Sequence, residues 1–147
     1  MRIPMKVDYG VRALMELAKQ YGDGEGQIQT ADIASKQGIP ESYLEQLMPT
    51  LNKFGLVNSR RGPGGGHTLG MEPSQITLNM VMTTLEGNNS PLDCFTSPTD
   101  CIFSESCAQQ EVWKSVDESI QSVLSNTTLA HLTQRQSYLS GSGMYQI

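Results

Sequence analysis

The sequence lacks any long apolar run, and it is short of cysteine and of positive charge. No stretch of its 147 residues approaches the roughly 20 apolar residues needed to cross a bilayer, and Met1 to Pro4 offer no signal-peptide segment. We therefore expect a cytoplasmic protein with no membrane partner. For a chain of this length in which 37% of the residues are hydrophobic, one compact domain is the expectation.

The three cysteines exclude a disulfide framework, because an odd number cannot all pair within one chain and a reducing cytosol opposes such bonds. Six residues separate Cys94 from Cys101, and five separate Cys101 from Cys107. Thiolates hold iron in clusters, and a flexible loop can wrap such a cluster. We favour an iron–sulfur cluster, with a weaker oxygen or nitrogen donor as fourth ligand. The alternatives are a thiol switch, vestigial cysteines or zinc, whose usual pair of cysteines two residues apart is absent.

A net charge of −5 is unfavourable for nucleic-acid binding, but the charge is unevenly distributed. Residues 46–71 carry three basic and no acidic side chains, whereas residues 72–147 carry two basic and eight acidic ones. DNA binding requires only local positive charge, so a basic stripe at Lys53, Arg60 and Arg61 is compatible with a phosphate-binding surface. A solvated acidic globule is the alternative on charge alone.

The first part of the chain has the pattern of consecutive helices. Apolar residues at helical spacing predict an amphipathic helix from about Met5 to Tyr21. Thr30 is a suitable N-cap for a second, short helix, which Gly38 ends.

A third helix is predicted after Pro40, with Pro49 expected to bend or shorten it. Two short helices joined by a glycine-containing turn are typical of a helix-turn-helix, in which Ile39 would plug the turn. Residues 56–59 and 67–69 then read as two strands joined by a glycine-rich tip at 60–66. A helical hairpin followed at once by a basic β-hairpin indicates a winged helix.

The candidates for contacts with double-stranded DNA are the third-helix residues Ser42, Tyr43 and Gln46 and the wing residues Arg60, Arg61 and His67. Serine and glutamine can hydrogen-bond to base edges, and tyrosine can reach a phosphate or a thymine methyl group. The two arginines can neutralise phosphates or enter a narrow minor groove, the alternative being a solvated turn. The tip lacks the Gly-Lys-Ser/Thr ending of a P-loop, so nucleotide hydrolysis is not expected.

The second half of the chain is predicted to be helical on both sides of a long loop. Residues 1–87 form the winged helix-turn-helix domain, whose last helix ends at Gly87. Residues 88–107 form the cysteine-bearing loop, which is long enough to be functional or disordered. Residues 108–135 hold a dimerisation helix and a short C-terminal helix, and residues 136–147 form a mobile tail. Docking of the long helix on its own domain is the alternative to dimerisation.

No nucleophile stands beside a base, since His67 and His131 are far apart in sequence and neither adjoins a convincing serine or cysteine site. We therefore predict a protein that is not an enzyme. A protein-interaction module that uses a winged helix without DNA is a further hypothesis.

Six segments and the three cysteines carry a resemblance to a known family; the segments are residues 8–14, 39–47, 55–57, 61–66, 76–78 and 85–87. The chain resembles the Rrf-two family of bacterial winged-helix transcriptional regulators along nearly its whole length. That family includes the cluster-bearing IscR, NsrR and RirA types and the cluster-free CymR type.

The resemblance implies a homodimer on a palindromic operator, with a C-terminal helix that crosses between the domains. It implies that Ser42, Tyr43 and Gln46 face the major groove and that Arg60 or Arg61 enters the minor groove. It also implies that the three cysteines ligate a 4Fe-4S or 2Fe-2S cluster.

One departure from the family is informative about the fourth ligand. The IscR type has a histidine three residues after the third cysteine, where this chain has Gln110, which argues against a 2Fe-2S centre of that type. The type that senses nitric oxide takes a carboxylate from the first helix of the partner subunit, and Asp8 stands at the matching position. Asp8 is therefore the candidate ligand, the alternative being a cap or salt bridge of the first helix.

The implied function is a repressor whose DNA affinity responds, through the cluster, to redox state, nitric oxide or iron and cluster status. The alternative is a cluster-free regulator of the same fold, controlled by a partner protein or by thiol oxidation.

Overall fold

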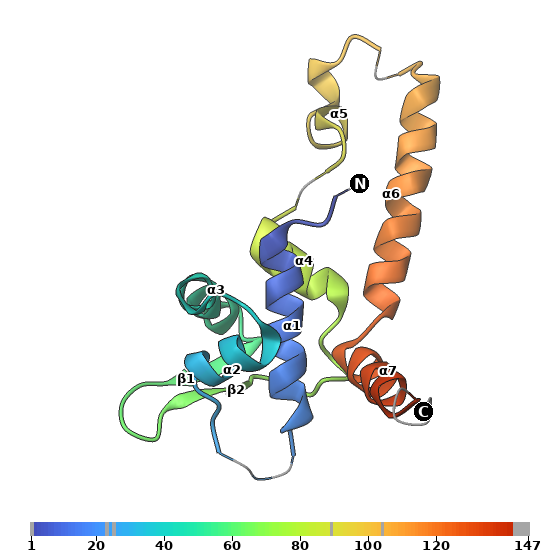
Figure 1. Ribbon diagram of the computed structural model, residues 1–147. Helices are drawn as coiled ribbons and strands as arrows, with labels where there is room; N and C mark the ends of the chain where they lie inside the picture. The colour runs from blue at the N-terminus through green and yellow to red at the C-terminus, as the bar shows by residue number, and fades with distance from the viewer. Residues whose placement is uncertain (1, 23, 25, 89, 104, 143–147) are drawn as a thin grey trace.

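The computed structural model describes residues 2–22, 24, 26–88, 90–103 and 105–142, and it is mainly helical with one small β-hairpin (Figure 1). The elements in chain order are α1 (Met5–Lys19), α2 (Thr30–Gln37), α3 (Glu41–Lys53), β1 (Val57–Arg60), β2 (Gly66–Leu69), α4 (Leu78–Glu86), α5 (Asp93–Thr96), the 3₁₀ turn η1 (Pro98–Asp100), α6 (Ala108–Asn126) and α7 (Leu129–Ser142). The predicted fold class, a winged helix-turn-helix followed by a long C-terminal helix, is confirmed. None of the helices in the described part is long and apolar enough to span a membrane.

Helix α1 is the central support of the domain, with α2, α3, α4 and α7 packed against it. Its buried apolar residues join those of the other elements in one core; examples with no more than 2% exposure are Leu14, Leu17, Ile33, Leu44, Leu51, Leu56 and Ile76. Each such aliphatic side chain contributes about 1.5–3 kcal/mol when it is fully buried. The relative positions of the helices are therefore fixed by apolar packing.

The turn between α2 and α3 forms as the sequence predicts, but α3 is longer than expected. Gly38 ends α2 in the left-handed region at φ 62°, which favours glycine, and Ile39 is 4% exposed and so plugs the turn. Pro49 does not shorten α3, which continues to Lys53. Pro49 lies on the exposed side of the helix, where water can satisfy the carbonyl that its missing N–H leaves unpaired.

The wing is an antiparallel hairpin in which Val57 pairs with Leu69 and Arg60 with Gly66, within one residue of the predicted limits. It is fixed to the segment before α2, because Ile28 forms an antiparallel bridge with residue 67 of β2. The two main-chain hydrogen bonds of this bridge measure 2.8 and 3.0 Å. The bridge positions the hairpin beside the helix-turn-helix.

The C-terminal half departs from the sequence prediction in two places. Helix α7 runs to Ser142 and packs against α1, so the mobile tail predicted for 136–147 is helical as far as Ser142, and residues 143–147 lie outside the described residues. The cysteine loop holds the short elements α5 and η1, so it is not structureless. Contacts with α1 explain why the chain stays helical as far as Ser142. The sequence pattern of this segment alone does not reveal such contacts with a distant helix.

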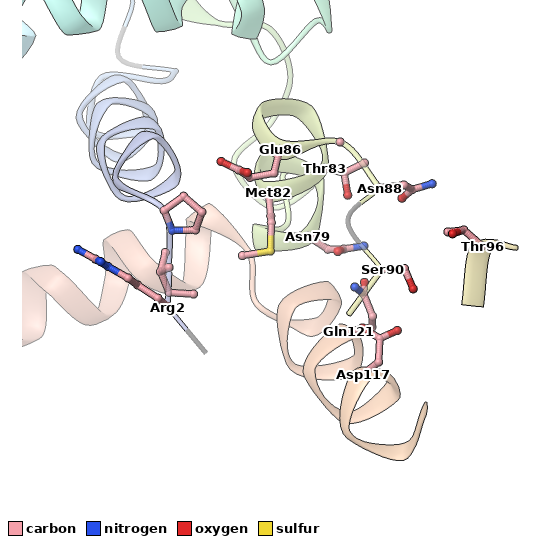
Figure 2. A pocket seen from close by; sticks show the side chains of 13 residues that line it. Arg2, Asn79, Met82, Thr83, Glu86, Asn88, Ser90, Thr96, Asp117 and Gln121 are labelled. Carbon is pink, nitrogen blue, oxygen red and sulfur yellow. The ribbon is translucent and has the colours of Figure 1, made fainter. Parts of the chain in front are cut away.

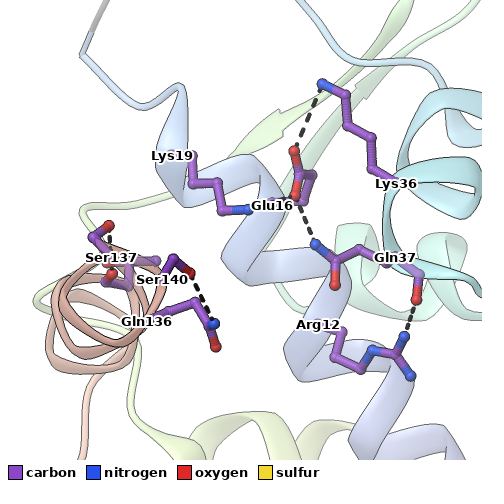
Figure 3. Close-up of polar contacts among 9 residues, drawn as sticks. Arg12, Glu16, Lys19, Lys36, Gln37, Gln136, Ser137 and Ser140 are labelled. Carbon is purple, nitrogen blue, oxygen red and sulfur yellow. Dashed lines mark hydrogen bonds and ion pairs between the residues drawn. The ribbon is translucent and has the colours of Figure 1, made fainter. Parts of the chain in front are cut away.

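A buried carboxylate ties α1 to the C-terminal end of α2 (Figure 3). Glu16 is 5% exposed, and its oxygens lie 2.9 Å from Lys19 Nζ and 3.6 Å from Lys36 Nζ. Gln37 Nε2 donates a hydrogen bond of 2.7 Å to the same carboxylate. Burial alone would raise the pKa of Glu16, but the hydrogen bonds and the two ammonium charges outweigh it, so this pKa lies below its ordinary value.

Replacing Glu16 with glutamine should destabilise the fold by about 1–3 kcal/mol at neutral pH, because the hydrogen-bonded charge is lost from a buried site. Since the pKa of Glu16 in the folded protein lies below 4.5, its ionised form stabilises the fold above that pH. This stabilisation is lost as the pH falls through the folded-state pKa. Urea unfolding of the wild type and Glu16→Gln should therefore give stabilities that converge progressively below pH 4.5.

The matched control is Glu72→Gln, which removes an exposed carboxylate and should change stability by less than about 0.5 kcal/mol. A Glu16→Gln difference of constant size across the acidic range would show that the charge of Glu16 does not stabilise the fold.

Candidate nucleic-acid interface

The N-terminal half of α3 presents a polar face to solvent. Ser42, Glu45 and Gln46 are exposed, whereas Leu44 and Leu47 are buried in the core on the other side of the helix. A helix of this kind is rigidly held and leaves its polar side chains free to hydrogen-bond. Such a helix is suited to the major groove, which admits an α-helix and displays a distinct donor and acceptor pattern for each base pair.

Tyr43 is half-buried and is held by an aromatic contact with α1. Its ring meets that of Tyr9 edge to face, with ring centroids 5.3 Å apart and an interplanar angle of 86°. The guanidinium carbon of Arg12 lies 5.6 Å from the centroid of the Tyr9 ring, within range of a cation–π interaction. Sequence reasoning missed Tyr9 and Arg12 as contributors to this surface. Their spacing on α1 places them on one side of that helix, but it does not reveal which residue of α3 they meet.

The wing places Arg60 and Arg61 in solvent at the end of β1. Beyond them the chain turns so tightly that Gly65 has no room for a side chain, since a Cβ atom there would overlap the carbonyl of Arg60. At Gly66 a Cβ atom would lie 2.7 Å from the carbonyl oxygen of Ile28. The glycines therefore allow a compact tip on which both arginines project.

His67 is engaged within the protein. Its Nε2 lies 2.8 Å from Oγ1 of Thr30, and its Nδ1 lies 2.7 Å from Oγ of Ser59. The prediction that Thr30 caps α2 is wrong, because Thr30 is the first helical residue and Gln29 occupies the cap position without a side-chain cap hydrogen bond. The hydroxyl of Thr30 pairs with the wing instead. Contact of His67 with DNA stays a prediction.

The cysteine loop presents three free thiols, each half-buried. Cys94 lies in α5, Cys101 follows η1, and Cys107 occupies the N-cap position of α6. Within the described ranges, no three His, Cys, Asp or Glu side chains are grouped so that they could hold a metal ion. The three donors are thus present on one segment without being gathered into one site.

A pocket of about 510 Å³ lies between the N-terminal segment, α4, α6 and the loop (Figure 2). Asn79 of α4 and Asp117 and Gln121 of α6 line it, and no cysteine does. Cys94 lines a neighbouring pocket together with Lys114. The loop therefore adjoins two pockets, each lined by both polar and apolar side chains.

Asp8 is exposed on α1, at an apolar groove of about 460 Å³ between α1, α4 and α7. One of its oxygens lies 3.5 Å from Arg12 NH1, and Arg12 also donates a hydrogen bond to the main-chain carbonyl of Gln37, the last residue of α2. In the described part of the chain Asp8 belongs to no group with the cysteines.

Helix α6 stands apart from the core, with α4 as its main neighbour (Figure 1). None of its residues is buried, and Val112, Val116 and Val123 are 61%, 42% and 65% exposed. These three valines, with Trp113 at 45% exposure, form what we call the α6 stripe. Exposed apolar surface of this extent on one helix is typical of an interaction site.

Comparison with known proteins identifies the family. The family described as "Rrf2: Iron-dependent Transcriptional regulator" matches residues 3–135. The chain belongs to the Rrf2 family. It is accordingly a transcriptional regulator and not an enzyme.

Several relatives of this Rrf2 regulator match nearly its whole length. The HTH-type transcriptional regulator IscR of Yersinia enterocolitica is 39% identical over 139 residues, which are 95% of this chain and 83% of that protein. IscR of Serratia proteamaculans is 38% identical over 139 residues, again 95% of this chain and 83% of that protein.

Solved structures of the Rrf2 type also superpose on most of the chain. The structure of CymR (YrzC), the global cysteine regulator of B. subtilis, matches with a TM-score of 0.78 and 36% identity over 92% of this chain and 98% of that one. T. potens IscR matches with a TM-score of 0.74 and 34% identity, over 92% of this chain and 88% of that one. The winged-helix interpretation of the sequence is thereby confirmed.

The contact between Tyr9 and Tyr43 should be measurable as a coupling energy. A double-mutant cycle of Tyr9→Ala and Tyr43→Ala, followed by urea unfolding, should give a coupling of about 0.5–1.5 kcal/mol, the usual range for an edge-to-face pair. In the control cycle Tyr21→Ala replaces Tyr9→Ala, and the exposed Tyr21, which follows α1, should show almost no coupling to Tyr43. Equal coupling in both cycles would mean that the aromatic contact contributes nothing specific.

Proposed function

We propose that this Rrf2 regulator is a homodimeric repressor that binds palindromic double-stranded DNA in the cytoplasm, and that an iron–sulfur cluster on its cysteine loop controls that binding. The observation that carries the proposal is the joint exposure of Ser42 and Gln46 on α3 and of Arg60 and Arg61 on the wing, on elements attached to one core. We call these four residues the reading surface.

The reading surface combines the two chemistries that sequence-specific DNA binding needs. The side chains on α3 can exchange hydrogen bonds with base edges, where each well-formed bidentate contact contributes about 1–3 kcal/mol of discrimination. The wing arginines supply positive charge for phosphates or for a narrow minor groove. The surrounding segment, residues 46–71, carries no acidic residue, so its local charge favours DNA although the chain as a whole is acidic.

Dimerisation is supported by the α6 stripe. A single chain leaves these apolar side chains in water, whereas a second copy packed against them would bury them. A two-fold dimer presents two recognition helices to successive major grooves, about 34 Å apart along the duplex. The operator is therefore expected to be palindromic.

The donor set of the loop fits an iron–sulfur cluster in chemistry, because it consists of three free cysteine thiols on one segment. Cys94, Cys101 and Cys107 would hold the cluster, and the loop would have to gather them. When bound, the cluster supplies iron that reacts with oxidants and nitric oxide. We propose Asp8 of the partner subunit as the fourth ligand of a 4Fe-4S or 2Fe-2S cluster, since both types take four protein ligands.

Asp8 also connects the proposed ligand set to the helix-turn-helix. It pairs with Arg12, which contacts both the C-terminal carbonyl of α2 and the ring of Tyr9. A change in the partner of Asp8 would release or tighten Arg12 and so bias the position of α2 and α3. Two positions that differ in DNA affinity would make this a population shift between binding and non-binding dimers.

A cluster-free regulator of the same fold, controlled by a partner protein or by thiol oxidation, is the second candidate. It is favoured by one observation, namely that the thiols are half-buried and not gathered in the described ranges.

Replacing Arg60 and Arg61 together with alanine should weaken binding to a fragment of the gene's own upstream region by at least about 30-fold, because two contacts of about 1 kcal/mol or more are lost. Gel shift at fixed salt measures this. Lys114→Ala, which removes an exposed cation from α6, should leave binding unchanged. Undiminished binding by the double variant, or no specific binding by the wild type, would contradict the proposed reading surface.

Protein purified under strict exclusion of air from iron-replete cells should be brown and contain iron and acid-labile sulfide. Cys101→Ala should lose both, Asp8→Ala should alter the absorption spectrum or the rate of cluster loss, and Ser97→Ala in the same loop should behave as wild type. Cluster-loaded and cluster-free dimers should differ in affinity for the same palindrome by about 5–150-fold at fixed salt, the usual range of allosteric coupling. Colourless, iron-free wild type would instead support the cluster-free candidate.

A further inference from the structure

His67 lies where the wing meets the helix-turn-helix, and all of its hydrogen-bonding groups are engaged. One ring nitrogen pairs with the hydroxyl of Thr30 in α2 at 2.8 Å, and the other pairs with the hydroxyl of Ser59 in β1 at 2.7 Å. Its main-chain N–H donates to Ile28 and its carbonyl accepts from Ile28, at 2.8 and 3.0 Å. One residue thus joins both strands of the wing to the segment that begins the helix-turn-helix.

The chemistry of the ring suits this connection better than a contact with phosphate. Burial lowers the pKa of His67 below its ordinary value of 6.5, so the ring is neutral at about pH 7. A neutral imidazole has one donor and one acceptor nitrogen, and each hydroxyl can take either complementary role. Thr30 and Ser59 therefore satisfy either tautomer, while the ring offers no positive charge to DNA.

The ring hydrogen bonds of His67 lie next to Arg60, a residue of the reading surface. Ser59 pairs with His67 across the hairpin, and the next residue, Arg60, pairs with Gly66. A cleft of about 330 Å³, lined by Arg60 and by residues of α2 and α3, lies between the wing and the helices. The strand β1 is also held directly to α3, because Ser59 N–H donates a hydrogen bond of 3.2 Å to Oδ1 of Asn52. The ring of His67 adds the side-chain connection from Ser59 of β1 to Thr30 of α2, at the edge of this cleft.

We propose that His67 is a positioning residue, whose two ring hydrogen bonds hold the wing at the angle at which Arg60 and the polar face of α3 engage one duplex together. This role differs from the direct DNA contact that the sequence predicts for His67, and it rests on the proposed DNA-binding function.

Two variants, which we call the bridge variants, remove the ring hydrogen bonds of His67 in different ways and leave its main-chain hydrogen bonds with Ile28 in place. His67→Phe keeps a ring but loses both ring hydrogen bonds, whereas the double variant Thr30→Val with Ser59→Ala keeps His67 and removes its partners. The double variant changes little side-chain volume, so it keeps the test valid if His67→Phe folds poorly. Thr68→Val is the matched control, because it removes a hydroxyl of β2 that has no hydrogen bond in the described part of the chain.

The first measurement compares operator variants by gel shift. In the wild type, replacing A·T with G·C pairs beneath the wing should weaken binding, because narrow A·T-rich minor grooves attract arginine. In both bridge variants this replacement should have an effect at least about five-fold smaller, while a base-pair change beneath α3 keeps its wild-type effect. Equal losses of discrimination beneath the wing and beneath α3 would overturn the positioning role.

The second measurement needs no DNA. Hydrogen–deuterium exchange of residues 57–69 should accelerate at least about ten-fold in both bridge variants, while residues 41–53 and the Thr68→Val protein stay at wild-type rates. Unchanged exchange in residues 57–69 would also overturn the proposal. If the wild type binds no DNA specifically, the proposed function fails, and exchange alone decides whether His67 anchors the wing.

Discussion

The exposed apolar stripe on α6 is the constraint on which the proposed assembly depends. Apolar surface left in water costs roughly 25 cal/mol for each Å² that a partner could bury. In one chain α4 contacts α6, but Val112 and Val123 remain more than half exposed. A second copy would cover them and hold two winged helices in a fixed relation. The spacing of the two reading surfaces, and hence the match to an operator, then follows from how the two α6 helices cross.

Within one chain, α1 is the element that contacts most of the other helices and one strand of the wing. It supports the core of the helix-turn-helix, carries the carboxylate that fixes the end of α2, and carries the Tyr9 ring that meets Tyr43. Asp8 and Arg12 lie on the same helix, one turn apart. A signal received by Asp8 would therefore act on α2 and α3 through neighbouring side chains, without a large rearrangement of the core.

Local patterns in the sequence were sufficient for most of the architecture. Helical spacing, Gly38 at the helix end and the glycine-rich tip located the helix-turn-helix and the wing, because local backbone chemistry determines these features. Contacts between distant segments were not predictable in the same way. The length of α7 and the pairing of Thr30 with His67 depend on tertiary packing that local pattern does not encode. For the cysteines the sequence supplies donors and spacing, but no local pattern identifies the fourth ligand, which we propose comes from a second subunit.

The mass of the protein in solution tests the central claim most directly. Sedimentation equilibrium at micromolar concentration, without DNA, should give a mass of two chains for the wild type and of one chain for Val116→Asp with Val123→Asp, because carboxylates in the α6 stripe would prevent its burial. Ser125→Asp, on the opposite side of the same helix, should remain dimeric. A monomeric wild type, or a double variant that stays dimeric, would contradict the assignment of the α6 stripe as the surface that joins two subunits.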